Sequence, residues 1–100
     1  MLFFVHLRLR TESAHRETVT PELVTLQIQH IHELLASGIV SNAWRRIEGV
    51  AIVMLMESTS EVDCRAILDA LPFSQAGVND IELVAQVEPY LDVYRDPLRD

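Results

Sequence analysis

Two polar residues stand inside the apolar face of a predicted helix. From about residue 21 to residue 37, apolar side chains recur with the period of a helix, and Gln27 and His30 fall within their arc. A buried amide or imidazole without a hydrogen-bond partner costs about 1–3 kcal/mol. The pair is therefore either a hydrogen-bonded part of the core or a polar patch at the bottom of a pocket between this helix and a sheet.

A histidine also stands in the middle of the first predicted strand. His6 shares one face of that strand with Phe4 and Arg8. Histidine titrates near neutral pH and can act as a general acid or base. His6 is therefore either a proton carrier or a histidine that bonds across a subunit interface. Glu82, in the last predicted strand, is the carboxylate that could act beside it or orient it.

An aromatic residue precedes two arginines in the second predicted strand. Trp44, Arg45 and Arg46 could bind an anion, because an aromatic floor and guanidinium groups suit a carboxylate. The alternative is an edge strand whose charges are solvated. Arg8 is a second candidate to hold a substrate carboxylate through paired hydrogen bonds.

The composition excludes several other chemistries. All eight basic residues are arginine, which excludes a catalytic lysine and a P-loop, and the net charge of -7 argues against a nucleic-acid partner. The three glycines form no phosphate-binding loop. His30 and His32 point about 200° apart on a helix, and Cys64 is the single cysteine. We therefore predict no metal site and no cofactor.

The elements that must position these residues follow the order strand, helix, strand, strand, helix, strand. Thr20-Pro21-Glu22 is typical of a helix start, Ser58 to Glu61 carries a capping-box pattern, and Gly38 is placed to end the first helix. We predict strands over 2–10, 40–47, 50–56 and 81–87. One helix is predicted over 21–37, and a second is opened by the capping-box pattern and ends near Leu71-Pro72. A polar loop, expected to be mobile, covers 11–20.

This order predicts a single α+β domain with the ferredoxin-like βαββαβ fold over residues 1–100. A four-stranded antiparallel sheet would carry two helices on one face, with the first and third strands in the middle. The core would cover about residues 1–88, and 89–100 would form a charged tail.

The third predicted strand is apolar on both faces. Val50 to Met56 does not alternate with polar residues, and such strands are normally covered on both sides. Because two helices cover only one face, we expect a second subunit on the other; the alternative is a half-exposed strand on a monomer.

No apolar run reaches the ~20 residues that span a bilayer, and His6 and Arg8 follow the apolar start too soon for a signal peptide. We expect a cytoplasmic protein without a membrane partner.

Short motifs over about the first ninety residues resemble those of muconolactone isomerases. In order, they are Met1-Leu2-Phe3-x-Val5, Glu33-Leu34-x-x-x-Gly38, Trp44-Arg45, Glu57-Ser58, Leu71-Pro72 and Ile81-Glu82. The resemblance implies a dimeric α/β barrel, often arranged in rings of dimers, and cofactor-free proton transfer on a small unsaturated lactone acid. In that family a carboxylate stands where this chain has Gln27 and a tyrosine where it has His30, and an amide cannot take up a proton as a carboxylate does.

We therefore expect a cofactor-independent isomerase or cyclase that moves a proton on a small lactone or conjugated carbonyl compound. The substrate would be anionic, and the protein would be a homodimer or a ring of dimers. Alternatives are a non-catalytic ligand-binding or assembly protein on the same scaffold and a cofactor-free monooxygenase of the same superfamily. The candidate catalytic residues are His6, His30 and Glu82, and the candidate substrate-binding residues are Gln27, Arg8, Trp44 and Arg45.

Overall fold

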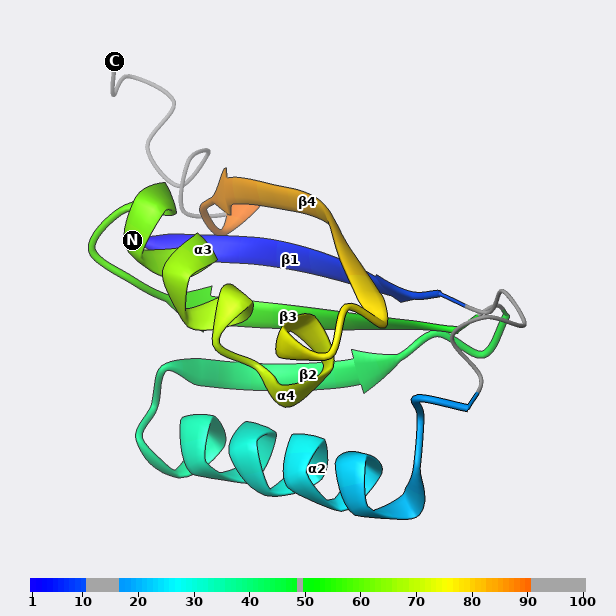
Figure 1. Ribbon diagram of the computed structural model, residues 1–100. Coiled ribbons are helices and arrows are strands. Elements are labelled where there is room, and N and C mark those ends of the chain that lie inside the picture. The colour runs from blue at the N-terminus through cyan, green and yellow to red at the C-terminus, as the bar shows by residue number, and fades with distance from the viewer. Residues whose placement is uncertain (11–16, 49, 91–100) are drawn as a thin grey trace, which may run out of the picture.

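The structure is a computed structural model that describes residues 1–10, 17–48 and 50–90. The four strands form one antiparallel sheet in the order β2-β3-β1-β4. This confirms the predicted ferredoxin-like α+β fold with β1 and β3 in the middle. Residues 11–16 of the predicted loop and 91–100 of the predicted tail lie outside the described residues. The elements are β1 (Leu2–Leu9), α2 (Pro21–Ala36), β2 (Val40–Arg45), β3 (Ala51–Glu57), α3 (Glu61–Asp69), α4 (Pro72–Gln75) and β4 (Asn79–Val87) (Figure 1).

Helix α2 begins at the residue that the sequence indicated, whereas α3 begins two residues later than its capping-box pattern indicated, with Ser60 in place of Ser58 as the N-cap. The Thr20 side chain accepts a hydrogen bond from the Leu23 amide at 3.1 Å, and Pro21 occupies the first turn. At α3, the Ser60 hydroxyl accepts one from the Asp63 amide at 3.1 Å. Gly38, just after α2, has a φ of 81°, which favours glycine at the end of a helix.

The region around Pro72 differs from the prediction. We expected one helix that ends near residue 71 and then a loop, whereas α3 ends at Asp69 and the four-residue helix α4 follows. Proline has no N–H to leave unpaired, so Pro72 begins a helix here instead of only ending one. The described part of the chain therefore contains a helix, α4, that the sequence pattern did not predict.

Two strand boundaries also differ from the prediction. β2 ends at Arg45, two residues before the predicted end, and Ile47 is 96% exposed. The Arg46 amide donates to the Ala51 carbonyl at 3.0 Å, so the chain is already turning toward β3 at this point. β4 begins at Asn79, two residues before the predicted start, because it pairs with Leu9 at the end of β1.

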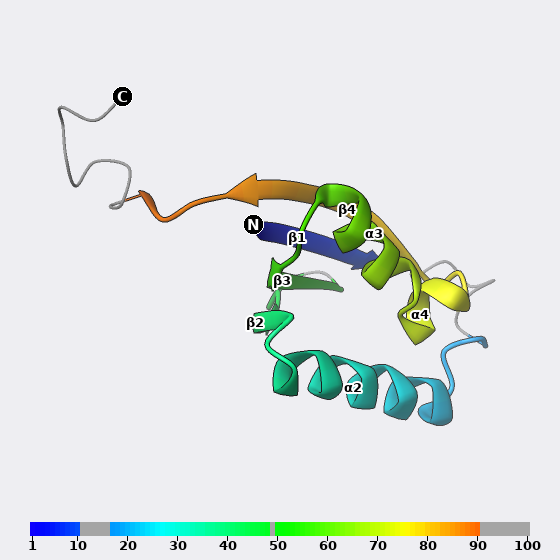
Figure 2. The same ribbon diagram turned by 90° about the vertical axis from the view of Figure 1, so that its left-hand side faces the viewer.

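The described helices lie on one side of the sheet, with α2 alongside β2 and with α3 and α4 next to β4 (Figures 1 and 2). On this side, Phe3 lies opposite Met56 and Val5 opposite Met54, and all four are fully buried. Residues directly opposite each other in a sheet share a face. The other side of the sheet carries Phe4, His6, Arg8, Val53, Leu55 and Leu83, and we call it the open face.

Candidate functional site

A hollow lies between α2 and the sheet. It consists of two adjoining cavities of about 390 Å³ and 230 Å³, which share Gln27, Ile28, Arg45 and Ile52 in their walls. We call the two together the helix-side pocket. The larger cavity also touches Leu7, Leu9 and Phe73, so its lining is mainly apolar. Pockets of this size and composition, with a few polar groups, are typical of small-molecule sites.

Gln27 is the polar group at the centre of this pocket. Its side chain is 3% exposed, and its Oε1 accepts a hydrogen bond from the Phe73 amide at 3.0 Å. Its Nε2 is buried and has no hydrogen-bond partner among the described residues. The predicted position of Gln27 in the apolar arc of the helix is therefore correct. Its amide is hydrogen-bonded at the oxygen and unpaired, among the described residues, at the nitrogen.

Arg45 and Trp44 lie on the edge strand beside the pocket. Arg45 lines both cavities, and it has no ion-pair partner within residues 1–10, 17–48 and 50–90. Trp44 lines the smaller cavity and is 49% exposed. A guanidinium at the rim of an apolar pocket can bind a carboxylate through paired hydrogen bonds.

His30 does not line the pocket, whereas His32 does. His30 is half-buried on the flank of α2 away from the two cavities, and His32 is exposed and lines the smaller one. Among the described residues that line the two cavities, His32 is therefore the one imidazole. In the sequence, His32 stands out only as a possible metal ligand beside His30, and the helical spacing alone does not show which flank of α2 faces a cavity.

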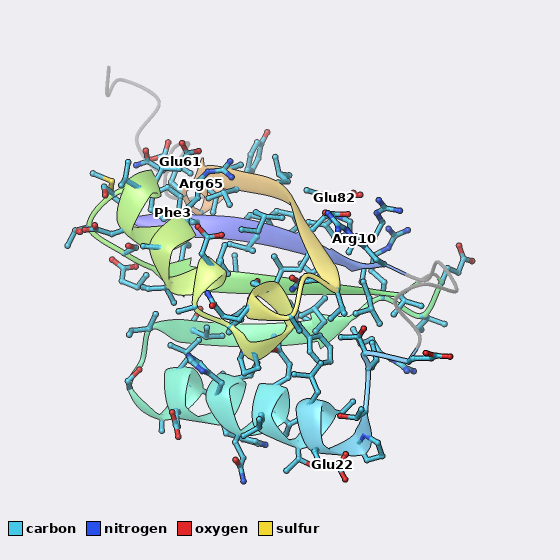
Figure 3. All side chains as sticks on the ribbon, in the orientation of Figure 1. Phe3, Arg10, Glu22, Glu61, Arg65 and Glu82 are labelled. Atoms are coloured by element: carbon cyan, nitrogen blue, oxygen red, sulfur yellow. The ribbon has the colours of Figure 1, made fainter. Side chains whose placement is uncertain are left out.

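His6, Arg8 and Glu82 meet on the open face. Arg8 Nε lies 2.6 Å from Glu82 Oε1, and His6 Nδ1 lies 3.5 Å from Glu82 Oε2, which is longer than a usual hydrogen bond. Asp80 extends this cluster to Arg10, with 2.6 Å between Arg10 Nη2 and Asp80 Oδ1, and Figure 3 shows Glu82 and Arg10 at the same end of the strands. The His6 Nε2 is buried and has no hydrogen-bond partner among the described residues.

A β-bulge brings Glu82 to this position. His6 pairs with Leu83 and the next residue, Leu7, pairs with Ile81, so Glu82 is the extra residue in β4. A bulge of this kind turns a side chain away from the regular alternation. Glu82 therefore reaches the same face as its neighbour Leu83, where it contacts Arg8 and His6.

The sheet thus separates the predicted site residues into two groups. Gln27 and Arg45 line the helix-side pocket with Trp44, whereas His6, Arg8 and Glu82 lie on the open face. His30 belongs to neither group. His6 and Glu82 therefore lie on the other side of the sheet from the helix-side pocket, and His30 is not among the residues that line that pocket.

Three further findings bear on chemistry and location. In the parts of the chain that the structure describes, no three His, Cys, Asp or Glu side chains are grouped so that they could hold a metal ion. Cys64 is a buried free thiol, and burial raises its pKa above the ordinary value, with Glu61 adding to the rise and Arg65 opposing it. No described helix is both long and apolar enough to span a membrane.

The fold and the pocket together define an α+β ferredoxin-like protomer with a ligand-sized hollow beneath its first helix. A similar solved structure is 5-chloro-2-hydroxyhydroquinone dehydrochlorinase from Burkholderia phenoliruptrix AC1100, in complex with 2,5-dihydroxybenzoquinone. The TM-score is 0.70 at 15% sequence identity, over 88% of this chain and 94% of that chain. No family model matches the sequence, and no curated protein does.

This likeness supports the ferredoxin-like α+β fold of the chain. At 15% identity it supports the fold alone. The narrower resemblance to muconolactone isomerases stays a prediction.

Proposed function

We propose that the protein is a cofactor-independent isomerase or cyclase that transfers a proton on a small lactone or conjugated carbonyl compound bound in the helix-side pocket. The observation that carries the proposal is the Gln27 side chain, which lines an apolar cavity of about 390 Å³ and whose buried Nε2 has no hydrogen-bond partner among the described residues. A hydrogen-bond donor in a water-poor cavity stabilises the negative charge that develops on a carbonyl oxygen when a neighbouring C–H loses its proton.

The other roles follow from the positions of the charged groups. Arg45 would hold an anionic group of the substrate at the rim, and Trp44 would flank it. His32 would carry the proton, since it is the imidazole of the described pocket lining and an imidazole can act as a general acid or base. His6 with Glu82 is the rival acid–base pair, and it would act only on a ligand at the open face.

A non-catalytic ligand-binding protein is the second candidate. In favour of it, no carboxylate lines either cavity among the described residues, and His32 is exposed at the margin of the smaller one. An apolar cavity with one donor and one cation is enough to bind a small anion without any proton transfer.

Exchange of solvent deuterium into the substrate separates the two candidates. Small unsaturated lactones and enone carboxylates are incubated with the protein in D2O, and the carbon next to the carbonyl is followed by NMR. An isomerase of the proposed type introduces deuterium there, whereas a binder shifts the ligand signals and introduces none. His32→Leu should slow exchange about 10²-fold or more, and His30→Leu is the matched control on the same helix. If His6→Leu alone abolishes exchange, the pair on the open face is the catalytic one.

We further propose that the protein works in the cytoplasm as a homodimer in which two open faces pack together. The half-buried Phe4, Val53 and Leu55 make the middle of this face apolar, and Leu83 is 46% exposed beside them. The flanking Arg8 and Glu82 give it charges of both signs, so a copy related by a two-fold axis can be complementary to it. Rings of such dimers would extend the same arrangement.

A further inference from the structure

The amide of Gln27 can have only one orientation in the folded chain. Its Oε1 accepts a hydrogen bond from the Phe73 backbone N–H at 3.0 Å, and a backbone N–H can only donate a hydrogen bond. Turning the amide over would place its NH2 against that N–H and leave both donors unpaired in a buried place, which is unfavourable. The NH2 group is therefore held away from Phe73, buried and without a partner among the described residues, in a side chain that lines both cavities.

The contact that fixes the amide is part of the fold. The Phe73 amide belongs to the first turn of α4, where the helix has no side-chain cap from Leu71. This N–H donates its hydrogen bond to Oε1 of Gln27, which lies on α2, 46 residues before Phe73 in the sequence. Any change that frees the amide to rotate would thus also remove a hydrogen bond that joins α2 to α4.

We propose that this fixed amide makes Gln27 the specificity-determining residue of the helix-side pocket. The pocket selects a ligand that presents an accepting oxygen, a ketone, lactone carbonyl or enolate, and disfavours a ligand of the same shape without one. Arg45 adds a preference for an anionic group, so the ligand class is a compact, largely apolar carbonyl compound with one carboxylate. This inference rests on the proposed function only in taking the pocket as the ligand site.

A matched pair of probes tests the selection without any turnover. The probes 4-acetylbenzoate and 4-isopropylbenzoate share the carboxylate and nearly the same shape, and they differ in a carbonyl oxygen against a methyl group. Titration calorimetry should show that the wild-type protein binds the ketone about tenfold more tightly or better, since the apolar probe leaves the buried NH2 unpaired.

Two variants of Gln27 identify the donor. Gln27→Glu keeps an acceptor for the Phe73 N–H but turns a carboxylate oxygen toward the pocket, so the preference for the ketone should vanish or reverse. Gln27→Met keeps the volume without either polar group and should bind both probes equally. Gln29→Glu, which is exposed on the same helix, is the control for added charge and should keep the wild-type preference. Circular dichroism melts identify any variant that does not fold.

The outcomes are distinct. Equal binding of the two probes by the wild-type protein overturns this inference and leaves the proposed reaction open to the deuterium assay. A preference that persists in the folded Gln27 variants also overturns it, because the donor then lies elsewhere. Binding of neither probe overturns the ligand site itself, and the proposed function with it.

Discussion

A charged substitution on one side of β3 should separate dimers, and the same substitution one residue further should unfold the protein. Val53 lies opposite His6 on the open face and is half-buried, whereas Met54 lies opposite Val5 and is 0% exposed. Val53→Glu and Met54→Glu therefore introduce the same charge on opposite faces of one strand. We expect Val53→Glu to give a folded monomer and Met54→Glu to give an unfolded chain.

The expected magnitudes differ because the two environments differ. A glutamate at residue 54 removes a fully buried methionine and leaves an unpaired charge in the core, which costs several kcal/mol out of the 5–15 kcal/mol that typically stabilise a domain. A glutamate at residue 53 would occur twice in a two-fold dimer. A cost of about 2 kcal/mol for each copy, about 4 kcal/mol in all, would weaken dimerisation about 10³-fold.

Sedimentation equilibrium gives the association state, and circular dichroism reports folding. Because a glutamate at residue 53 could pair with His6, Leu55→Glu is a second variant on the same face, opposite Phe4. A wild-type protein that sediments only as the 11.4 kDa chain at micromolar concentration would refute the dimer. Unchanged dimerisation in both open-face variants would refute the open face as the interface.

The remaining predictions concern metals, the helix-side pocket and the thiol. Chelators should leave any activity unchanged in a deuterium-exchange assay; loss of activity that one particular ion restores would contradict this. Gln27→Leu should lower turnover by about 10²-fold, whereas Gln27→Glu should raise activity on a muconolactone-like substrate and lower it on the native one. Cys64 should make the free energy of unfolding fall as pH rises above about 9.0, because its raised pKa keeps the thiol neutral in the folded state while it ionises in the unfolded chain. Urea melts of the wild type and Cys64→Ala should therefore differ in slope against pH above that value and run parallel below it.

The elements could be predicted because their signals are local. Thr20 and Pro21 fix the start of α2 through one side-chain hydrogen bond and one missing N–H, both of which depend on neighbouring residues alone. The unbroken apolar run of β3 likewise indicates a central strand, and this signal depends on the residues of the run alone. The order of strands then follows, since few topologies fit this order of elements.

The site could be predicted only in part, because its geometry depends on pairing between distant segments. The helical period places Gln27 toward the sheet, but its partner Phe73 comes from a helix that no periodicity indicates. The same period leaves His30 and His32 on opposite flanks of α2, and only the position of β2 decides which flank lines a cavity. The position of Glu82 depends on a bulge, which belongs to the register of two strands and not to either strand's sequence.

The separation of polar groups by the sheet limits what a single protomer can do. The helix-side pocket offers a fixed donor in Gln27 and a cation in Arg45, so it can hold and polarise a carbonyl compound, and its described lining contains no carboxylate base. The carboxylate that the resemblance led us to expect is replaced by an amide that caps α4 instead. The proposed proton transfer in this pocket would therefore depend on His32, and the comparison of His32→Leu with His30→Leu tests whether the scaffold here catalyses a reaction or only binds.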